Sequence, residues 1–454
     1  MSDICRREHG AIDMTQGSPT RLILLFSLPL LVGNVFQQLY NMVDSVVVGQ
    51  FVGSSALTAV GTGFPIIFLL SSLFIGFAMG ATIMIAQYIG AGDQAAAART
   101  VDTIYSALLV VILPLTVLGV AVSGPLLTLI RVPPEAFDQA RVYCMVVLGG
   151  IIGSLGYNLN AGILQGLGDS KTPLVFLAVA CGINVALDLL FVLAFHWGVF
   201  GVALATIIAQ FCSWVFGVFF INRKYPFLHI RFFQMRLDRR LLGQVVHLGI
   251  PSAIQQCQFS VGILMMQALI NGFGNDFSAG FTAANKIDTF AFMPIQSFTT
   301  ATTTYVGQNI GAGRLDRVKT GARRALALGT LVCIAITAVV VPLRRPLLML
   351  FNQEPAVVAA GEAYLLRVLT PMFILAMMFI LGAVLRGAGA TVVPMVASIL
   401  SLWVVRVPVA YLLAHFFGPE ELYWAYPIGW ALGLAISAAA YLRGRWRGKA
   451  VVGQ

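Results

Sequence analysis

Twelve long apolar stretches constrain this chain more than any other feature. A helix that crosses a membrane needs about 20 mostly apolar residues, and a closed β-barrel would instead show short segments of alternating hydrophobicity. The runs here are continuous, so the sequence predicts an all-α polytopic membrane protein with twelve transmembrane helices. The stretches cover 22–48, 56–89, 101–127, 140–164, 173–195, 198–221, 242–271, 279–310, 318–343, 363–384, 391–417 and 425–442.

The scarcity of charge supports this interpretation. Only 10% of the 454 residues are charged, whereas soluble domains carry about 25%. The net charge of +10 would suggest nucleic acid as a partner in a soluble protein, but in a membrane protein it is better explained by the positive-inside rule. We therefore expect the lipid bilayer as a partner, and no nucleic acid.

The basic residues also predict the orientation. They concentrate in the loops on the side of the chain termini, and residues 222–241 form the most basic connector. Cytoplasmic loops carry the excess of Lys and Arg, so both termini are expected in the cytoplasm of a multi-pass protein of the cell (inner) membrane. The first twenty residues lack the apolar core of a signal peptide, and none is expected.

An internal repeat divides the chain into two halves. The connector 222–241 separates residues 1–221 from residues 242–454, with six predicted spans on each side. Gln87-Tyr-Ile-Gly-Ala-Gly92 matches Gln308-Asn-Ile-Gly-Ala-Gly313 at an offset of 221, and Leu164-Gln-Gly-Leu-Gly168 matches Leu385-Arg-Gly-Ala-Gly389 at the same offset.

An even number of spans makes the two repeats parallel. Duplicated transporters bind substrate at the repeat interface and rock one half against the other. The repeat therefore favours a transporter over a channel or an enzyme.

Two carboxylates in the N-terminal half, Asp44 and Asp188, are candidates for binding a coupling ion, and Asn184 lies one helical turn before Asp188. A carboxylate at the centre of a membrane helix costs about 2.5–3.5 kcal/mol on insertion scales. Two of them in one half therefore suggest a function. The alternative is that they join helices by hydrogen bonds.

Eight further residues are predicted to line a substrate cavity. Gln37, Tyr40 and Asn41 share a helix face with Asp44, because they lie three to seven residues before it. Polar stripes on the fourth and sixth spans and soft methionine side chains in the second half supply the rest, although helix packing explains these equally well. The other five predicted cavity residues are Tyr157, Asn158, Gln210, Met266 and Met293.

The repeat provides an internal comparison for the acidic residues. At the repeat register Asp44 corresponds to Met266, and Asp188 corresponds to Val409. Because the second half lacks carboxylates at these positions, the fold does not require them, and the coupling-ion site is predicted in the first half. Lys286, Asp288 and Arg406 remain open, either as interface anchors or as a structural ion pair.

Motifs of other function classes are not found. The six cysteines are scattered without a Cys-x-x-Cys pair, and no zinc-protease, Walker A or nucleophile-elbow motif occurs. We expect no enzyme activity, no metal site and no cofactor apart from the coupling ion.

The chain resembles the multidrug and toxic compound extrusion (MATE) family over about residues 15–445. The resemblance is carried by Pro29, Tyr40-Asn-Met-Val-Asp44, the two Ile-Gly-Ala-Gly motifs, Leu164-Gln-Gly-Leu-Gly-Asp169 and Asn184-Val-Ala-Leu-Asp188. It implies a secondary antiporter that exports drug-like organic cations or amphiphiles in exchange for H⁺ or Na⁺.

The resemblance points to the proton-coupled, DNA-damage-inducible (DinF-like) branch. Asp44, Asn184, Asp188 and Thr206 match the acid cluster of that branch. The sodium-coupled branch uses acids in spans seven and ten, which this chain lacks. A small amphiphilic substrate and a monomer are expected, and a lipid or lipid-linked oligosaccharide flippase of the same superfamily is the alternative. The sequence names neither the substrate nor the coupling ion.

Overall fold

The structure is a computed structural model that describes residues 10–130, 132–230 and 236–452. Within these ranges the chain is helical and contains no strand, which confirms the all-α prediction. Contacts divide the chain into two compact units. The N unit comprises residues 1–13 and 32–253, and the C unit comprises residues 14–31 and 254–454.

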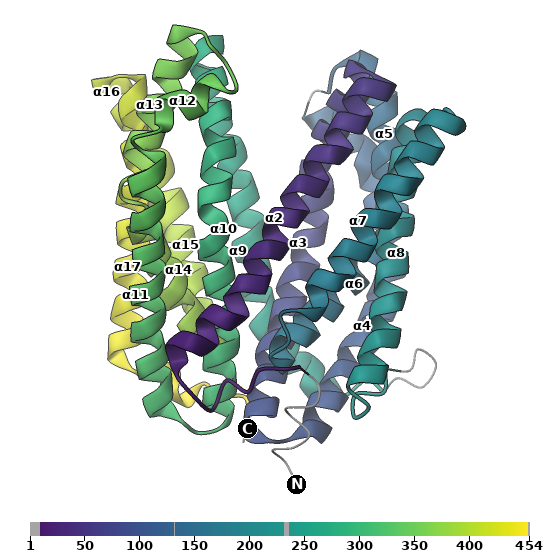
Figure 1. The fold of residues 1–454 in the computed structure, drawn as a ribbon, viewed down its shortest axis with the longest axis vertical. Helices are drawn as coiled ribbons and strands as arrows, with labels where there is room; N and C mark the ends of the chain where they lie inside the picture. Colours follow the sequence, from purple (N-terminus) through teal and green to yellow (C-terminus); the bar gives the residue numbers. More distant parts are fainter. Residues whose placement is uncertain (1–9, 131, 231–235, 453–454) are drawn as a thin grey trace. The chain divides into compact units, whose positions relative to one another are not determined.

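The helices of the N unit follow one another with short connections, and α7 packs along α8 (Figure 1). Part of the basic connector, residues 231–235, lies outside the described residues. The elements are the second part of α2 (Pro19–Val47), η1 (Val48–Val52), α3 (Ser54–Ala91), α4 (Gln94–Leu129), α5 (Pro134–Gly149), α6 (Ile151–Leu167), α7 (Thr172–Leu189), η2 (Leu190–Ala194), α8 (Gly198–Lys224) and the first part of α9 (Arg239–Asn271).

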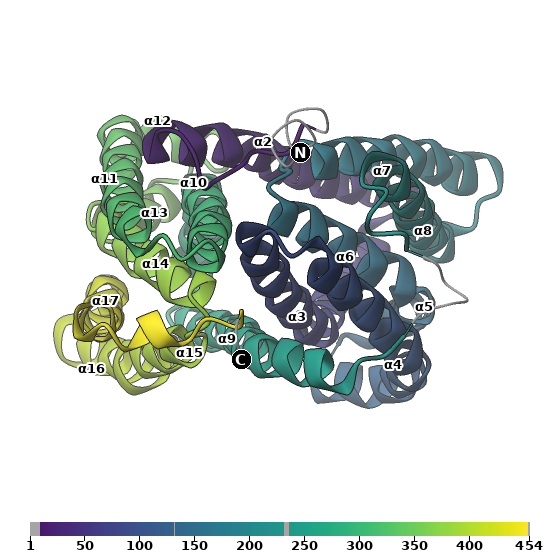
Figure 2. The ribbon, with the colours of Figure 1, turned by 90° about the horizontal axis from the view of Figure 1, so that it is seen from below.

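In the C unit, α10 packs against α11, α13 and α14, and α17 packs against α14 and α15, as the end-on view shows (Figure 2). The elements are the first part of α2, the end of α9, α10 (Asn275–Gly311), α11 (Leu315–Val340), α12 (Arg344–Met349), α13 (Pro355–Leu369), α14 (Met372–Gly387), α15 (Val392–Ile399), η3 (Leu400–Arg406), α16 (Val407–Phe417), η4 (Pro419–Trp424), α17 (Ala425–Arg443) and η5 (Arg445–Gly448).

The two halves repeat the same irregular features. The α5–α6 pair bends by 51° and the α13–α14 pair by 47°. Gly168 ends α6 with a φ of 91°, and Gly389 follows α14 with a φ of 92°. Glycine adopts this left-handed conformation without steric cost, so the repeated glycines of the two matching motifs serve the same turn in both halves.

Nine helices of the described residues are long and apolar enough to cross a membrane, or eleven if each bent pair is one span. The remaining span of the twelve expected is α10. It has 37 residues, which is ample length, but it carries seven threonines. Many of its side chains are buried in the C unit, so lipid contact demands less hydrophobicity of it.

Glycines bring α3 against the first part of α9 within the N unit. A Cβ atom on Gly76 would lie 2.3 Å from the backbone N of Ala253, and one on Gly80 would lie 2.5 Å from the backbone O of Val245. Close backbone approach at small residues is typical of membrane helix packing, where hydrophobic burial supplies no drive. These glycines therefore fix how α3 crosses α9.

The repeated Gln308–Gly313 motif has a structural role in the C unit. The side chain of Gln308 accepts a hydrogen bond from the backbone N of Met14 (3.0 Å), and Asn309 donates to the carbonyl of Met14 (2.9 Å). Arg314 donates to the carbonyl of Thr15 (2.7 Å). This motif therefore holds the segment that precedes α2.

Candidate functional site

The site is built around Asp44 of α2 and Asp188 of α7, both in the N unit. Their carboxyl groups are hydrogen-bonded to each other. Asp188 is 1% exposed, and Asp44 is partly buried. The Oδ1 atom of each is buried without a hydrogen-bond partner among the described residues. We call these two residues the acid pair.

Three polar side chains surround the acid pair. Asn184, one helical turn before Asp188, is buried, and its Nδ2 lies 3.5 Å from Oγ1 of Thr206 on α8. Tyr40, one turn before Asp44, is hydrogen-bonded to Thr206 and lies close enough to interact electrostatically with both acids. The structure thus brings the four predicted coupling-ion residues together and adds Tyr40, which the sequence assigned to the substrate cavity.

The acid pair has an apolar lining. Tyr143 of α5 is 7% exposed and interacts electrostatically with both carboxyl groups. Its ring belongs to a buried cluster with Val48, Val192 and Val202, among others. An apolar lining lowers the local dielectric constant and so strengthens the electrostatic interactions of the acid pair.

Both acids lie next to π-helical turns. The π-helix η1 begins at Val48, four residues after Asp44, and η2 begins at Leu190, two residues after Asp188. A π-turn interrupts the regular hydrogen bonding of an α-helix, and such turns occur frequently at functional sites. The helices that carry the acids therefore have local points of adjustment beside them.

The chemistry of the acid pair follows from its geometry. A hydrogen bond between two carboxyl groups requires a proton on one of them, because two adjacent carboxylates repel. The oxygen atoms of Asp44, Asn184, Asp188 and Thr206 are also ligands that a hard cation such as Na⁺ prefers. No group of three or more His, Cys, Asp or Glu side chains suited to a metal ion occurs in the described part of the chain.

The other cavity candidates of the N unit lie on three helices. Gln37 donates to Oδ1 of Asn41 (3.4 Å) on α2. Tyr157 and Asn158 lie on α6 and Gln210 lies on α8, all partly buried. Their assignment to a substrate cavity stays a prediction.

The two methionines of the C unit are buried. Met266 of α9 is 2% exposed within an apolar core, and Met293 of α10 is 7% exposed. In this structure Met266 offers almost no surface to a substrate, which favours the packing interpretation over the cavity interpretation.

Met266→Asp is expected to prevent folding. The substitution would place a carboxylate in an apolar core, and such burial is costly unless the charge is paired. We expect loss of monodisperse protein after detergent extraction, measured by size-exclusion chromatography, while Met266→Leu keeps the wild-type profile. Normal yield and profile of Met266→Asp would show that this core admits a charge.

A second ionic cluster lies in the C unit, and the sequence analysis named two of its residues, Asp288 and Arg406, without pairing them. The hydroxyl of Tyr364 donates to Oδ2 of Asp288 (3.1 Å). The guanidinium of Arg406 stacks on the ring of Tyr426 at 3.6 Å and lies 5.9 Å from the ring of Trp430. Asp288 and Arg406 attract each other electrostatically, so the structure joins two residues that the sequence left open.

One signal in the sequence could have found this cluster. Tyr364 is the repeat counterpart of Tyr143, at the offset of 221, and Tyr143 borders the acid pair. Arg406 is the last residue of the π-helix η3. Lys286 lies apart from the cluster: its Nζ is 5.5 Å from the ring centre of Phe351, in a pocket of about 450 Å³.

Sequence reasoning missed a further group, which is centred on Asp169 of the N unit. Its Oδ2 accepts hydrogen bonds from Nζ of Lys224 (2.7 Å), the hydroxyl of Tyr225 (2.9 Å) and the hydroxyl of Thr172 (2.5 Å). Its Oδ1 accepts from the backbone N of Lys171 (3.2 Å) and of Thr172 (3.0 Å). The sequence analysis named Asp169 only as the last residue of the Leu164–Asp169 motif and predicted no role for it.

Comparison with known proteins identifies the chain's relatives. The MatE family model matches residues 29–190 and 251–412. The "Probable multidrug resistance protein YpnP" of Bacillus subtilis (strain 168) is 30% identical over 445 residues, which cover 96% of this chain and 98% of that protein. The "FAD transporter" of Shewanella oneidensis is 24% identical, with 92% of this chain and 93% of that protein covered.

Solved structures share the fold. "Crystal structure of MATE in the bent conformation" superposes with a TM-score of 0.87 at 23% identity, covering 96% of each chain. "Outward-facing conformation of a multidrug resistance MATE family transporter of the MOP superfamily" has a TM-score of 0.86 at 24% identity, covering 96% of this chain and 97% of that one. The duplicated, all-helical architecture predicted from the sequence is therefore confirmed.

Proposed function

The chain belongs to the MatE family of transporters, and on this premise we propose that it is a secondary antiporter that exports drug-like organic cations or amphiphiles in exchange for H⁺ or Na⁺. The proposal places it in the cell (inner) membrane as a monomer with both termini in the cytoplasm. The observation that carries the proposal is the hydrogen-bonded acid pair, Asp44 and Asp188.

The acid pair supplies a switch that responds to one bound cation. With a proton or Na⁺ bound, the two carboxyl groups lie together and hold α2 against α7. Without it, two anions about 4 Å apart repel by roughly 4 kcal/mol at an effective dielectric constant of 20. A free-energy difference of this size is enough to shift an equilibrium between two conformations. The π-helical turns η1 and η2 are the places where α2 and α7 would bend.

The same site would favour positively charged substrates over neutral or negatively charged ones. An ionised acid pair attracts an organic cation, and binding of H⁺ or Na⁺ removes that attraction, so ion and substrate exclude each other. This exclusion is what exchange requires. The names of relatives such as "Probable multidrug resistance protein YpnP" agree with cargo of this class.

The membrane potential supplies useful energy. Each elementary charge that crosses 100 mV contributes about 2.3 kcal/mol, which corresponds to a concentration ratio of about fifty. One inward-moving cation exchanged for an uncharged amphiphile therefore supports substantial accumulation of substrate outside the cell. One-for-one exchange for a singly charged organic cation moves no net charge, and the concentration gradient of the coupling ion alone drives it.

Transport by the purified protein tests the proposal. In proteoliposomes with a fluorescent lipophilic cation as the probe, we expect transport when a proton gradient or a sodium gradient is imposed separately, and none without a gradient. The exposed acid Asp316 provides a control, because Asp316→Asn should transport like the wild type. If neither gradient drives the probe, the antiporter proposal is wrong.

A cellular assay separates the exporter from the flippase alternative. Expression in an efflux-deficient bacterial host should raise tolerance to several cationic drugs, because export lowers their internal concentration. Unchanged tolerance, together with rescue of a strain that lacks a lipid-precursor flippase, would favour the alternative.

A further inference from the structure

Basic side chains gather at one end of the C unit, where α11 begins and α17 ends (Figure 1). Arg323 of α11 and Arg447 of η5 both lie close enough to the hydroxyl of Tyr441 to interact with it electrostatically. Lys319 lies one helical turn before Arg323 on the same face, and Arg445 lies two residues before Arg447. All four cations are exposed, and we call them the basic patch.

The C-terminal turn fixes the position of its arginine side chains. Gly444 ends α17 with a φ of 71°, and the chain folds back so that the indole N–H of Trp446 donates to the carbonyl of Tyr441 at 2.9 Å. Trp446 is 2% exposed, and its ring stacks on that of Tyr441 at 5.5 Å. The guanidinium of Arg447 lies 5.8 Å from the centre of the Trp446 ring. Arg447 therefore has a defined place in the fold.

No acidic side chain neutralises the basic patch. Residues 422–454 contain no Asp or Glu, and Asp316 is the only acid of α11. Among the described residues, none of the four cations of the patch forms an ion pair. Elsewhere in the C unit an arginine does find acids, because Arg367 contacts Glu421 at 2.6 Å. The positive charge of the basic patch is thus left for a partner outside the protein.

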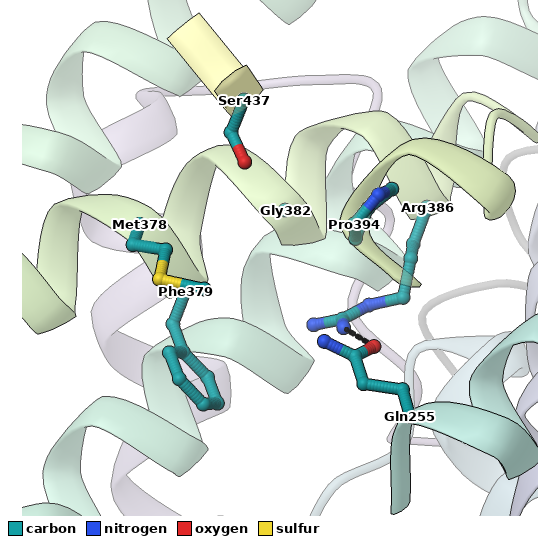
Figure 3. Close-up of a pocket in the computed structure, with 7 residues that line it drawn as sticks. All are labelled: Gln255, Met378, Phe379, Gly382, Arg386, Pro394 and Ser437. Carbon is teal, nitrogen blue, oxygen red and sulfur yellow. Dashed lines mark hydrogen bonds between the residues drawn. The ribbon is translucent and has the colours of Figure 1, made fainter. Parts of the chain in front are cut away.

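Arg386 provides a contrast, because it lacks an acidic partner but is enclosed by the C unit. It is 7% exposed and donates to Oε1 of Gln255 at 3.0 Å, beside a cavity of about 10 Å³ (Figure 3). A cavity of this size holds one water at most. Arg386 therefore serves the packing of α9 against α14, whereas the cations of the basic patch face outward.

An apolar stripe continues from the basic patch along α11. Ala327, Leu331 and Ile334 follow Arg323 at intervals of four, four and three residues, so all of them share one face of the helix. The three apolar side chains are exposed, Leu331 by 64% and Ile334 by 52%. Because α11 is long and apolar enough to cross a membrane, this stripe faces lipid, and the cations stand at its end.

We propose that the C unit binds one anionic phospholipid, with its phosphate at Arg323 and Arg447 and an acyl chain along the apolar stripe. A guanidinium binds phosphate through two parallel hydrogen bonds. Clusters of Lys and Arg beside a membrane helix attract anionic lipids, and the apolar stripe provides the contact for the chain. A zwitterionic lipid carries the same phosphate but adds a cation, which the unneutralised charge of the patch repels.

Lipid retention by the purified protein tests the proposal. The delipidated protein is titrated in detergent with phosphatidylglycerol or with phosphatidylcholine of the same chains, and native mass spectrometry counts the bound lipids. We expect one tightly retained phosphatidylglycerol and weaker retention of phosphatidylcholine. Each cation near an anionic lipid surface changes the affinity about fivefold, so Arg323→Gln/Arg447→Gln should weaken retention of phosphatidylglycerol at least about tenfold.

Two controls separate this site from a general attraction between charges. Arg236→Gln/Arg239→Gln removes the same charge from exposed arginines of the N unit and should retain phosphatidylglycerol like the wild type. Glycerol phosphate, which carries the phosphate without acyl chains, should not displace the lipid, because it makes no contact with the apolar stripe.

Four outcomes would each overturn the proposal: equal retention of the two lipids by the wild type, an unchanged preference in Arg323→Gln/Arg447→Gln, an equal loss in the control variant, or displacement by glycerol phosphate at the lipid's own concentration. The single variant Arg447→Gln, with an expected loss of about fivefold, keeps the test open if the double variant does not fold. Because these measurements involve neither drug nor gradient, their outcome is independent of the antiport proposal.

Discussion

Replacing Asp44 or Asp188 by Asn is expected to abolish gradient-driven export while leaving the protein folded. An amide is nearly the same size as a carboxyl group and keeps a hydrogen-bond acceptor, but it neither binds a proton nor supplies a charge. Both residues belong to one hydrogen-bonded pair, so the loss of either removes the switch. Transport in proteoliposomes should fall to the level of vesicles without protein.

The competing explanation makes a different prediction. Interhelical hydrogen bonds in membranes contribute about 0.6 kcal/mol on average, so if the acids only joined α2 to α7, Asn would substitute with a small loss. Coupled sites titrate as a unit, and the double variant should therefore transport no worse than either single variant.

An exposed acid provides the control for the acid pair. Asp138 of α5 is exposed in the same unit, and Asp138→Asn should transport normally. Substrate binding should survive in Asp44→Asn, because the amide resembles the protonated acid, and fluorescence titration measures it. Export against a gradient by Asp44→Asn at the wild-type rate would exclude this residue from ion coupling.

Asp169→Ala is expected to destabilise the N unit strongly. Asp169 is 1% exposed, and its removal leaves Lys224, Tyr225 and two backbone N–H groups without their acceptor. Breaking a buried charge pair by removing one partner costs about 3–5 kcal/mol. Burial and the neighbouring Asp169 raise the pKa of the Tyr225 hydroxyl, so Tyr225 stays a hydrogen-bond donor across the working pH range.

A helix-capping aspartate outside this network calibrates the effect. Asp93 accepts a hydrogen bond from the backbone N of Ala96 (2.8 Å) at the start of α4 and is exposed. Asp93→Ala should cost about 1 kcal/mol, as expected for loss of a helix cap. Thermal unfolding followed by circular dichroism should rank wild type above Asp93→Ala and Asp93→Ala above Asp169→Ala. Equal melting temperatures for the two variants would show that the buried network around Asp169 stabilises the protein no more than an exposed helix cap does.

The sequence alone determined the class of fold and its duplication. Apolar runs of membrane-spanning length leave few alternatives to helices, and the matching glycine motifs fixed the register of the repeat. Helical spacing also placed Tyr40 and Asp44 on one face, because positions four residues apart lie one turn apart. All three inferences rest on patterns along the chain, which a sequence displays directly.

Only the tertiary structure decided which side chains meet. Asp44 and Asp188 are 144 positions apart in the sequence, and Asp288 and Arg406 are 118 positions apart. No rule of helical spacing relates the members of either pair. Met266 occupies the repeat position of Asp44 yet is buried in a core, while the ionic cluster of the C unit uses positions without acidic counterparts.

Periodicity identifies the face of a helix, but the neighbour of that face depends on how helices rotate and cross. In a membrane that geometry is set by close contacts between small residues, such as Gly76 and Gly80 against α9, because burial of apolar surface gives no preference among partners.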